Sequence, residues 1–352
     1  MATIFNRFVT SCLFVLTLCA LAHHALANQT FVDSAGRSVS IPDHIDRVMA
    51  AGPPASTFLY ALVPAKLVGW VKEPAAAALP FLLSSAAALP VQSRLTAKDG
   101  TINAAAILAL KPDLIVDIGD VSPRYAETAD KVQSQTGIPY ILLDGHYAKT
   151  ADSLRIVGKL LGVPDRGEEL ASYAEHVQAE VNAAIAKVPS NKRPVIYYGR
   201  GESGLETGRF GSINLEIFDV VGARNAAAEL GSGGITQVSE GQVVQWKPDF
   251  IFAETETFYQ QAQKETAFAD LSALKSGRVF RAPVLPFGWI DSPPSVNRLL
   301  GVKWLLAVLY PDLASGDLGS DTRQFYKLFY GVDLTDEQAK DFLKSVVPAK
   351  SP

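Results

Sequence analysis

Short apolar runs alternate with longer amphipathic runs along most of the chain. The amphipathic runs carry apolar residues at spacings of three and four, which predicts helices, and the short apolar runs predict buried strands. Strands that alternate with helices in this way form mostly parallel sheets covered on both faces, so we predict an α/β fold. Residues 31–41 alternate around a Ser-Ala-Gly turn and predict a small hairpin. The other predicted strands are 47–51, 67–71, 114–118, 140–143, 195–198, 250–253 and 279–281, and the predicted helices include 57–62, 103–110, 125–136, 153–161, 213–221, 268–274, 296–309 and 335–346.

Two segments far apart in the chain repeat each other. They are Ile107-Leu-Ala-Leu-Lys-Pro-Asp-Leu-Ile-Val116 and Val243-Val-Gln-Trp-Lys-Pro-Asp-Phe-Ile-Phe252, and each combines an apolar helix end, a Lys-Pro-Asp turn and a short strand. Their lysines lie 136 positions apart (247 minus 111). A repeat of this length indicates two similar lobes rather than a solenoid of short units.

The stretch 165–188 lies between the two repeats and has the clearest helical pattern. Apolar residues at spacings of three and four form one face from Leu170 to Val188, and Asp165 and Glu168 have the spacing of a capping box. These 24 residues would span roughly 36 Å as a helix, which is long enough to join two lobes. A surface helix within one domain is the alternative, and the flanking repeat argues against it.

We therefore predict four segments in the chain. Residues 1–27 are a secretory signal peptide, 28–164 a first α/β lobe, 165–188 a rigid linking helix, and 189–352 a second α/β lobe that ends in a helical tail. The signal is indicated by one arginine, an apolar run at 14–22 and a small-x-small cleavage site. The apolar run is too short for a comfortable membrane span. We expect cleavage after Ala27 and a soluble, periplasmic, monomeric protein.

Charge and cysteine content narrow the class of partner. The chain has 32 Lys and Arg against 36 Asp and Glu, and the signal holds one of the basic residues, so the exported part carries 31 minus 36, or −5. This mild acidity argues against nucleic acid or an anionic membrane as a partner. Both cysteines, Cys12 and Cys19, lie in the signal, so no disulfide is expected.

A glycine-rich segment follows the first predicted strand of the second lobe. Gly199-Arg-Gly201-Glu-Ser-Gly204 has the form of a dinucleotide-binding motif, but two more glycines come before any helical pattern. A dinucleotide site needs its third glycine at the start of a helix, so that interpretation is rejected. The segment is either a loop that surrounds a ligand or a plain connector. As a ligand loop it would present Tyr198, Arg200, Glu206 and Arg209.

Catalytic and metal motifs are not found in the sequence. The serine motif lacks its last glycine, and no group of His, Cys and acidic residues has zinc spacing. We expect no enzyme activity, no cofactor and no metal bound by protein atoms alone. His146 follows a predicted strand and is either a ligand-site residue or a solvated loop residue. Trp289 lies in a Pro- and Gly-rich loop, where it either stacks on a ligand or fills the base of the following helix.

Several of these stretches together resemble the periplasmic-binding-protein family that serves iron-siderophore, haem and cobalamin ABC importers. They are strand-Gly-Pro-Pro-x-Ser near residue 52, Leu67-Val-Gly69, Leu110-Lys-Pro-Asp-Leu-Ile115, the long central helix, Gln245-Trp-Lys-Pro-Asp249 and Trp289-Ile-Asp-x-Pro-Pro294. The resemblance covers nearly the whole exported chain. It implies two lobes joined by a single helix, a cleft between them, and delivery of a ligand to a membrane permease.

Permease docking departs from what the resemblance implies. The family usually carries a surface glutamate on each lobe, but the expected place in the first lobe is an alanine within Asn103-Ala-Ala105. In the second lobe the matching place is Gly241, with Glu240 beside it. Glu240 is therefore our only docking candidate, and docking through other acids is expected.

The resemblance, taken with the sequence, leads to one functional expectation and two alternatives. We expect an exported protein that captures a metal chelate, a ferric siderophore or other iron complex, and delivers it to an ABC importer permease and its ATPase. Arg200 and Arg209 would neutralise an anionic chelate, Tyr198 and Trp289 would pack against it, and His146 would reach it from the first lobe. The alternatives are a molybdate- or tungstate-type oxyanion binder and an exported hydrolase or metalloenzyme on the same scaffold.

Overall fold

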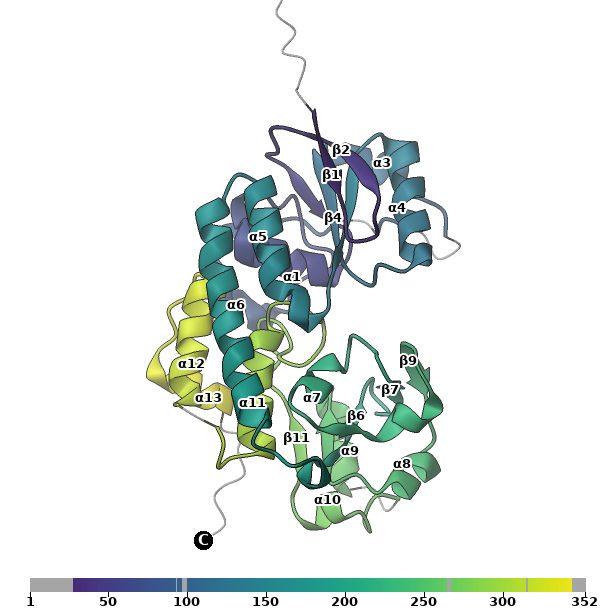
Figure 1. Cartoon of the computed structure of the whole chain (residues 1–352), viewed down its shortest axis with the longest axis vertical. Coiled ribbons are helices and arrows are strands. Elements are labelled where there is room, and N and C mark those ends of the chain that lie inside the picture. Colours follow the sequence, from purple (N-terminus) through teal and green to yellow (C-terminus); the bar gives the residue numbers. More distant parts are fainter. Residues whose placement is uncertain (1–27, 93, 97–99, 265–266, 315, 344–352) are drawn as a thin grey trace, which may run out of the picture.

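The computed structural model describes residues 28–92, 94–96, 100–264, 267–314 and 316–343, so the expected signal peptide lies outside the described residues. Two α/β lobes lie one above the other, and one long helix, α6 (Pro164–Ile185), runs past the place where they meet (Figure 1). The predicted α/β class with two lobes is confirmed.

The first lobe is built on a small parallel sheet with strand order β3-β4-β5. The strands are almost wholly buried apolar runs, as expected for a sheet covered on both faces. The predicted hairpin is present as β1 and β2, paired antiparallel. The elements of this lobe are β1 (Asn28–Val32), β2 (Ser38–Pro42), β3 (Val48–Ala50), α1 (Pro53–Leu62), η1 (Pro64–Lys66), η2 (Ala76–Phe81), α2 (Ser84–Ala87), α3 (Ala104–Ala109), β4 (Leu114–Gly119), α4 (Pro123–Thr136), β5 (Tyr140–Asp144), η3 (Tyr147–Lys149) and α5 (Thr150–Leu160).

The second lobe repeats this plan with a parallel sheet of order β11-β10-β6-β8. The glycine-rich segment does not open a helix. It continues into β7, which pairs antiparallel with β9 to form a separate two-stranded sheet. The elements are η4 (Ser190–Lys192), β6 (Val195–Gly199), β7 (Glu206–Gly208), α7 (Glu216–Val220), β8 (Arg224–Asn225), η5 (Ala226–Leu230), β9 (Ile235–Gln237), α8 (Glu240–Trp246), β10 (Phe250–Ala253), α9 (Glu256–Lys264), α10 (Ser272–Lys275) and β11 (Val279–Arg281).

The two Lys-Pro-Asp motifs have the same geometry in both lobes. Lys111 and Lys247 each end a helical segment with a positive φ, 47° and 49°. The following aspartates each accept a backbone N–H at the start of a parallel strand of their own lobe. Asp113 accepts the N–H of Arg47, just before β3, at 2.8 Å, and Asp249 accepts that of Val195 in β6 at 2.7 Å. The sequence repeat is therefore a structural repeat, in which the aspartate fixes the start of one strand against another.

The linking helix packs closely against α5. Gly158 and Gly167 meet at this contact, since a Cβ built on Gly158 would lie 2.8 Å from the Gly167 Cα. The helix begins one residue earlier than predicted and has no side-chain cap. The predicted capping box is therefore wrong, because Glu168 bonds instead to Arg155 of α5, at 2.7 and 2.8 Å.

The C-terminal helices lie along the linking helix instead of extending away from the second lobe (Figure 1). They are α11 (Arg298–Leu309), α12 (Leu318–Phe325), the π-helical η6 (Tyr326–Tyr330) and α13 (Asp336–Leu343). Lys303 of α11 contacts Glu180 of α6 at 2.7 Å and Asp321 of α12 at 3.1 Å. In the first lobe, the Tyr60 hydroxyl donates to the Tyr330 carbonyl at 2.7 Å. The tail thus joins the two lobes in addition to α6.

One continuous apolar core runs from the first lobe through α6 to α11 and the tail. Two smaller clusters fill the outer halves of the lobes. The predicted strand at 67–71 is wrong: its residues form only single bridges, from Leu67 to Val48 and from Trp70 to Val91. Within the described part of the chain, none of the helices combines the length and the apolar character that crossing a membrane requires.

Candidate functional site

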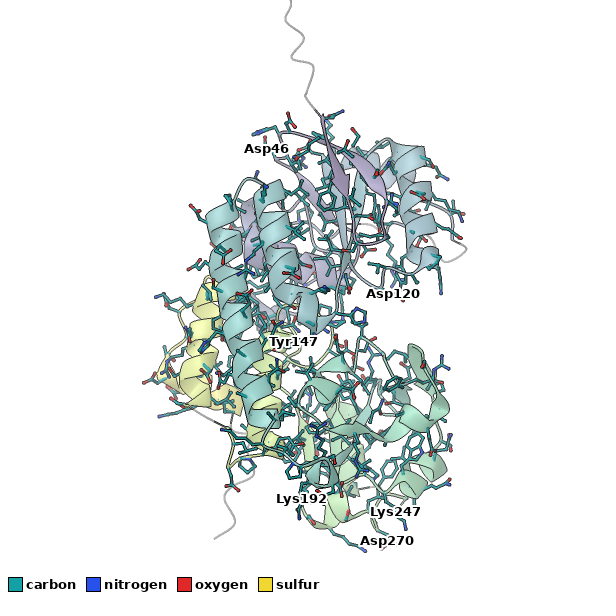
Figure 2. The ribbon with its side chains drawn as sticks, in the orientation of Figure 1. Asp46, Asp120, Tyr147, Lys192, Lys247 and Asp270 are labelled. Atoms are coloured by element: carbon teal, nitrogen blue, oxygen red, sulfur yellow. The ribbon has the colours of Figure 1, made fainter. Side chains whose placement is uncertain are left out.

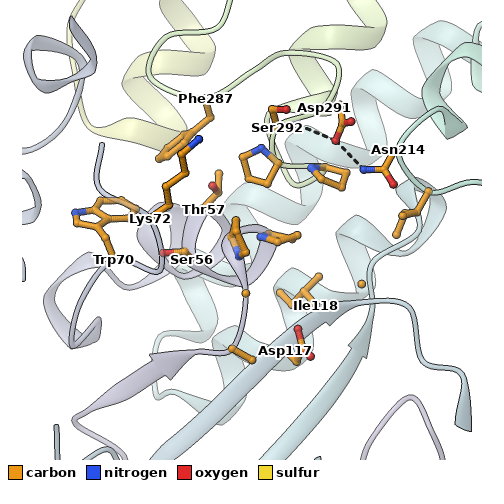
Figure 3. A pocket seen from close by; sticks show the side chains of 18 of the residues that line it. Ser56, Thr57, Trp70, Lys72, Asp117, Ile118, Asn214, Phe287, Asp291 and Ser292 are labelled. Atoms are coloured by element: carbon orange, nitrogen blue, oxygen red, sulfur yellow. Dashed lines mark hydrogen bonds between the residues drawn. The ribbon is translucent and has the colours of Figure 1, made fainter. Parts of the chain in front are cut away.

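A cavity of about 770 Å³ lies between the two lobes. Its first-lobe wall follows the carboxyl ends of β3 and β4, and its second-lobe wall follows the end of β6 and the loop before α11 (Figure 3). In open parallel sheets ligands bind outside the carboxyl ends of the strands. Both sheets present that edge to the same space, so this cavity is the candidate binding site.

The first-lobe wall is formed largely by the start of α1. Gly52 precedes the helix and is followed by Pro53 and Pro54, which occupy its first two positions, where a missing N–H costs nothing. Ser56 and Thr57 follow, and Figure 3 shows both side chains beside the cavity. Ser56 is 3% exposed, and its Oγ has no hydrogen-bond partner among the described residues.

Two aromatic rings, one from each lobe, form part of the cavity wall. Trp70 from the first lobe and Phe287 from the second lie with their ring centres 5.9 Å apart, and both line the cavity. Behind them, the rings of Tyr60 and Tyr330 pack at 5.4 Å from Trp70 and 5.5 Å from Phe287, respectively. The two lobes therefore share one aromatic wall, which the core supports from behind.

Asp117 brings a carboxylate to the first-lobe wall from near the end of β4. Its Oδ2 accepts a hydrogen bond from the Tyr140 hydroxyl at 2.9 Å. Its Oδ1 lies close to the start of α1, 3.8 Å from the position that a Cβ on Gly52 would take. Burial raises the pKa of Asp117, and the bond from Tyr140 opposes that shift.

Asp291 is the corresponding buried carboxylate of the second-lobe wall. It lies 2.7 Å from the Arg200 Nε and accepts hydrogen bonds from Asn214 Nδ2 at 2.9 Å and from the Ser292 N–H at 2.7 Å. Burial raises its pKa even though Arg200 is adjacent. Arg200 also approaches Glu254, at 3.5 Å. The guanidinium of Arg200 is thus already paired within the protein.

Arg200 is the one sequence-predicted ligand residue that lines this cavity. Tyr198 lies behind it in the core, with its ring 5.6 Å from that of Phe218, and burial raises its pKa well above the ordinary value. Glu206 belongs to β7 and accepts a hydrogen bond from Gln237 of β9 at 3.0 Å. Arg209 follows β7 and packs against Gly233. The glycine-rich segment therefore does not surround the cavity, because β7 pairs with β9.

Trp289 and His146 also lie outside the cavity. Trp289 is 1% exposed and packs near Phe342, with ring centres 6.3 Å apart, so it fills the core at the base of α11 in this structure and is not available for stacking on a cavity ligand. His146 is exposed, and its Nδ1 lies 2.5 Å from the Asp144 carboxylate. It lines a separate small crevice beside Arg298.

The docking candidate lies on the surface of the second lobe. Glu240 is exposed in the first turn of α8, which begins with a capping box between Ser239 and Gln242. In the first lobe, Ala105 is exposed near the start of α3. Both positions lie on the surface of their lobes.

Five residues that line the cavity were not predicted as ligand-site residues from the sequence: Ser56, Trp70, Lys72, Asp117 and Phe287. One signal could have indicated Asp117, since a polar residue near the end of a buried strand lies at the edge of the sheet where ligands bind. Asp291 follows the predicted ligand residue Trp289 by two positions, in the Trp-Ile-Asp motif. The tryptophan is buried, and the aspartate lines the site.

Comparison with known proteins supports this picture. The family model described as periplasmic binding protein matches residues 82–284. An ABC transporter solute binding protein from Sulfurospirillum deleyianum is 27% identical, with a TM-score of 0.81 over 90% of this chain and 99% of that one. A periplasmic solute binding protein from Veillonella parvula is 26% identical, with a TM-score of 0.72 over 91% and 97%.

A curated relative, the molybdate-binding protein MolA of Haemophilus influenzae, is 24% identical over 362 residues, which cover 94% of this chain and 98% of that protein. The matches extend over both lobes and the helices that join them. The family model covers more than half of the chain, and the fold has two parallel-sheet lobes facing one cavity. This chain belongs to the periplasmic binding protein family.

Proposed function

We propose that this periplasmic binding protein captures a metal chelate, a ferric siderophore or other iron complex, in the cavity between its lobes. It then delivers the chelate to the permease of an ABC importer, which works with its ATPase. The protein is exported by the signal at 1–27 and acts as a soluble monomer. Its task is binding and release, with no chemistry on the ligand.

The size of the cavity is the observation that carries this proposal. A volume of about 770 Å³ lies within the range of roughly 300–1,000 Å³ that holds drug-sized ligands. A four-oxygen oxyanion fills the space of only a few water molecules, at about 30 Å³ each. The walls are also apolar and stiff, with Trp70, Phe287 and several prolines. A bulky chelate with apolar parts fits such walls better than a small ion.

A molybdate-type oxyanion is the second candidate ligand. Two observations favour it: the similarity to a molybdate-binding protein along nearly the whole of both chains, and the unpartnered Ser56 Oγ in the first turn of α1. Helix starts attract anions through their free N–H groups. Here Pro53 and Pro54 remove two of those donors, and the Asp117 carboxylate lies close by. No observation favours the hydrolase or metalloenzyme alternative.

Of the residues expected from the sequence, we retain Arg200 as a ligand-site residue because it lines the cavity. Its role is to hold Asp291 and Glu254 rather than to neutralise an anion. We assign no ligand contact to Tyr198, Glu206, Arg209, Trp289 or His146. We further propose that exposed Glu240 contributes to permease docking.

The test is a calorimetric titration of protein purified from the periplasm of an expression host. The ligands are a panel of ferric siderophores, haemin, cobalamin and molybdate. Saturable binding of an iron complex at micromolar or lower concentration is the expected result. If only molybdate binds, the oxyanion becomes the preferred ligand class. If neither the chelates nor molybdate bind, the proposed ligand class is wrong.

A further inference from the structure

We infer that the inter-lobe cavity selects a chelate that brings positive charge and hydrogen-bond donors, and that it rejects anionic complexes and free oxyanions. This inference rests on the function proposed above and specifies its ligand class. It differs from the sequence-based expectation, in which two arginines would neutralise an anionic ligand.

The first observation is the charge of the cavity wall. Its charged lining residues are four acids and two bases, so the wall has a formal charge of two minus four, or −2. The bases are Lys72 and Arg200, and the acids are Glu73, Asp117, Asp120 and Asp291. Figure 2 shows Asp120 on the side of the first lobe that faces the second lobe.

The second observation is that Arg200 is not available to an anion. Its Nε lies 2.7 Å from Asp291, which is 2% exposed, and Nη2 lies 3.5 Å from Glu254. A buried carboxylate that loses its cationic partner is strongly destabilised, so the pair with Asp291 is held. With this pair neutralised, the remaining charged residues of the lining are one base, Lys72, and three acids, Glu73, Asp117 and Asp120.

The third observation concerns hydrogen-bond donors. Six prolines line the cavity and contribute no backbone N–H donor: Pro53, Pro54, Pro74, Pro286, Pro293 and Pro294. The carbonyls of Pro54 and Pro293 already accept bonds from Ser295 and Asn297.

The other donors of the second-lobe wall are used within the protein. The Asn214 amide donates to Asp291, and the Ser292 hydroxyl donates to Glu254. The second-lobe wall therefore leaves few donors free for a ligand, which suits a ligand that supplies its own donors.

The fourth observation is the group at the start of α1. The positive end of a helix attracts negative charge, but the Asp117 carboxylate already lies there, 3.8 Å from the position of a Cβ on Gly52. A ligand carboxylate or oxyanion at this place would face that charge. A ligand ammonium or hydroxyl group could donate to Asp117, and also to the buried Ser56 Oγ, which has no partner among the described residues.

The experiment compares ligands that share one iron centre and differ in charge. The ferric complex of desferrioxamine B carries a pendant ammonium group, and succinylation of that amine replaces it with a carboxylate. We expect the cationic complex to bind about tenfold or more tightly than the anionic one. The double variant E73Q/D120N should shrink this ratio several-fold. The asparagine at 120 can still accept the Ser122 N–H, which Asp120 accepts at 2.8 Å.

The matched control is Glu127→Gln, which removes an exposed charge from α4 outside the cavity lining and should leave the ratio unchanged. A second measurement does not depend on which chelate binds. Amide signals of Gly52 and Asp120 are recorded in the presence of a cationic amino nitroxide and of an anionic carboxy nitroxide. The cationic probe should broaden them more.

The outcomes separate the inference from the proposed function. Tighter binding of the succinylated complex, or stronger broadening by the anionic nitroxide, would overturn the charge preference. If neither iron complex binds but the cationic nitroxide broadens the signals more, the charge preference stands and the chelate assignment is lost. Tight molybdate binding by the wild-type protein would overturn both.

Discussion

The Arg298 guanidinium of α11 donates a 2.6 Å hydrogen bond to the Gly145 carbonyl, which lies just after β5 of the first lobe. The same guanidinium contacts Glu216 of the second lobe at 3.0 Å, and Glu216 in turn accepts the Tyr147 N–H at 2.9 Å. Figure 2 shows Tyr147 where the two lobes meet. Arg298 is 2% exposed, and burial lowers its pKa. One buried cation thus ties the lobes together beside the cavity.

Removal of this cation should destabilise the whole protein. Arg298→Met leaves the Glu216 carboxylate without its partner, and breaking a buried pair in this way costs roughly 3–5 kcal/mol. Urea denaturation followed by circular dichroism measures the change. The control is Arg155→Met, since the Arg155 contacts with Glu168 and Glu175 are on the surface and should contribute little. Equal losses in the two variants would contradict the role assigned to Arg298.

Two glycine-to-alanine changes should have opposite effects on the free energy of unfolding, one at the contact between α5 and α6 and one at an open position of α8. In Gly158→Ala the new methyl would lie 2.8 Å from the Gly167 Cα, so the helices must separate, at a cost of about 1–3 kcal/mol. In Gly241→Ala, at the start of α8, the nearest atom would be 3.9 Å away, and helix propensity then favours alanine by up to about 1 kcal/mol. Thermal unfolding of both variants tests the pair. A stable Gly158→Ala protein would contradict the close helix contact.

The fold could be predicted because its strands are short apolar runs and its two halves repeat. The Lys-Pro-Asp copies proved to be structurally equivalent, with Asp113 and Asp249 making the same backbone contacts. The prediction was wrong where local pattern competes with tertiary contacts. Leu67 and Trp70 belong to a short apolar run of the kind that forms buried strands, but each makes only one bridge. Glu168 has capping-box spacing, but Arg155 from another helix binds it.

The site was harder to predict because its walls come from several segments that are distant in the chain. Trp70 and Phe287 form one aromatic wall from opposite lobes, and no local pattern relates positions 70 and 287. The glycine-rich segment after β6 was predicted to surround a ligand, but its residues Glu206–Gly208 pair with β9. Trp289 was predicted to stack on a ligand because it is aromatic and lies in a loop, but its side chain is buried in the core. Of the side chains that the sequence motifs indicated, Arg200 lines the cavity, whereas Tyr198, Glu206, Arg209, Trp289 and His146 do not.

The positions of the four tryptophans predict which one reports ligand binding. Trp70 lines the cavity, whereas Trp289 is buried away from it. Quenching of intrinsic fluorescence by a bound ferric chelate falls with distance, so Trp70→Phe should lose the largest part of the signal change. Trp289→Phe should keep most of it. Titration of both variants under identical conditions is the measurement, and calorimetric affinities of the two variants allow their signal changes to be compared at equal saturation. If Trp289→Phe loses most of the signal change and Trp70→Phe keeps it, Trp289 lies closer to the bound ligand than Trp70 does.

The pH dependence of binding should distinguish a cationic chelate from an oxyanion. Burial raises the pKa of Asp117, so its charge is lost at a higher pH than that of an exposed aspartate. A cationic ligand favours the ionised carboxylate, and its affinity should therefore fall as acidification protonates Asp117, by at most about tenfold per pH unit for one proton. An oxyanion would show the opposite slope. The groups around Asp117 that can also influence this pH dependence are Tyr140, which bonds to it, and Lys72, Glu73 and Asp120, which line the same cavity.

Asp291 also has a raised pKa and lines the same cavity. A variant is therefore needed to show which of the two aspartates causes the pH dependence of the affinity. Asp117→Asn keeps an acceptor for the Tyr140 hydroxyl but cannot titrate, and it should flatten most of the slope for the cationic complex. The double variant E73Q/D120N removes two exposed acids but leaves Asp117 in place, so it should shift the affinity without removing the slope that Asp117 causes. Calorimetric titrations from neutral to mildly acidic pH provide the comparison. If the wild-type protein binds its chelate more tightly on acidification, Asp117 does not face positive charge, and the anionic ligand class would be restored.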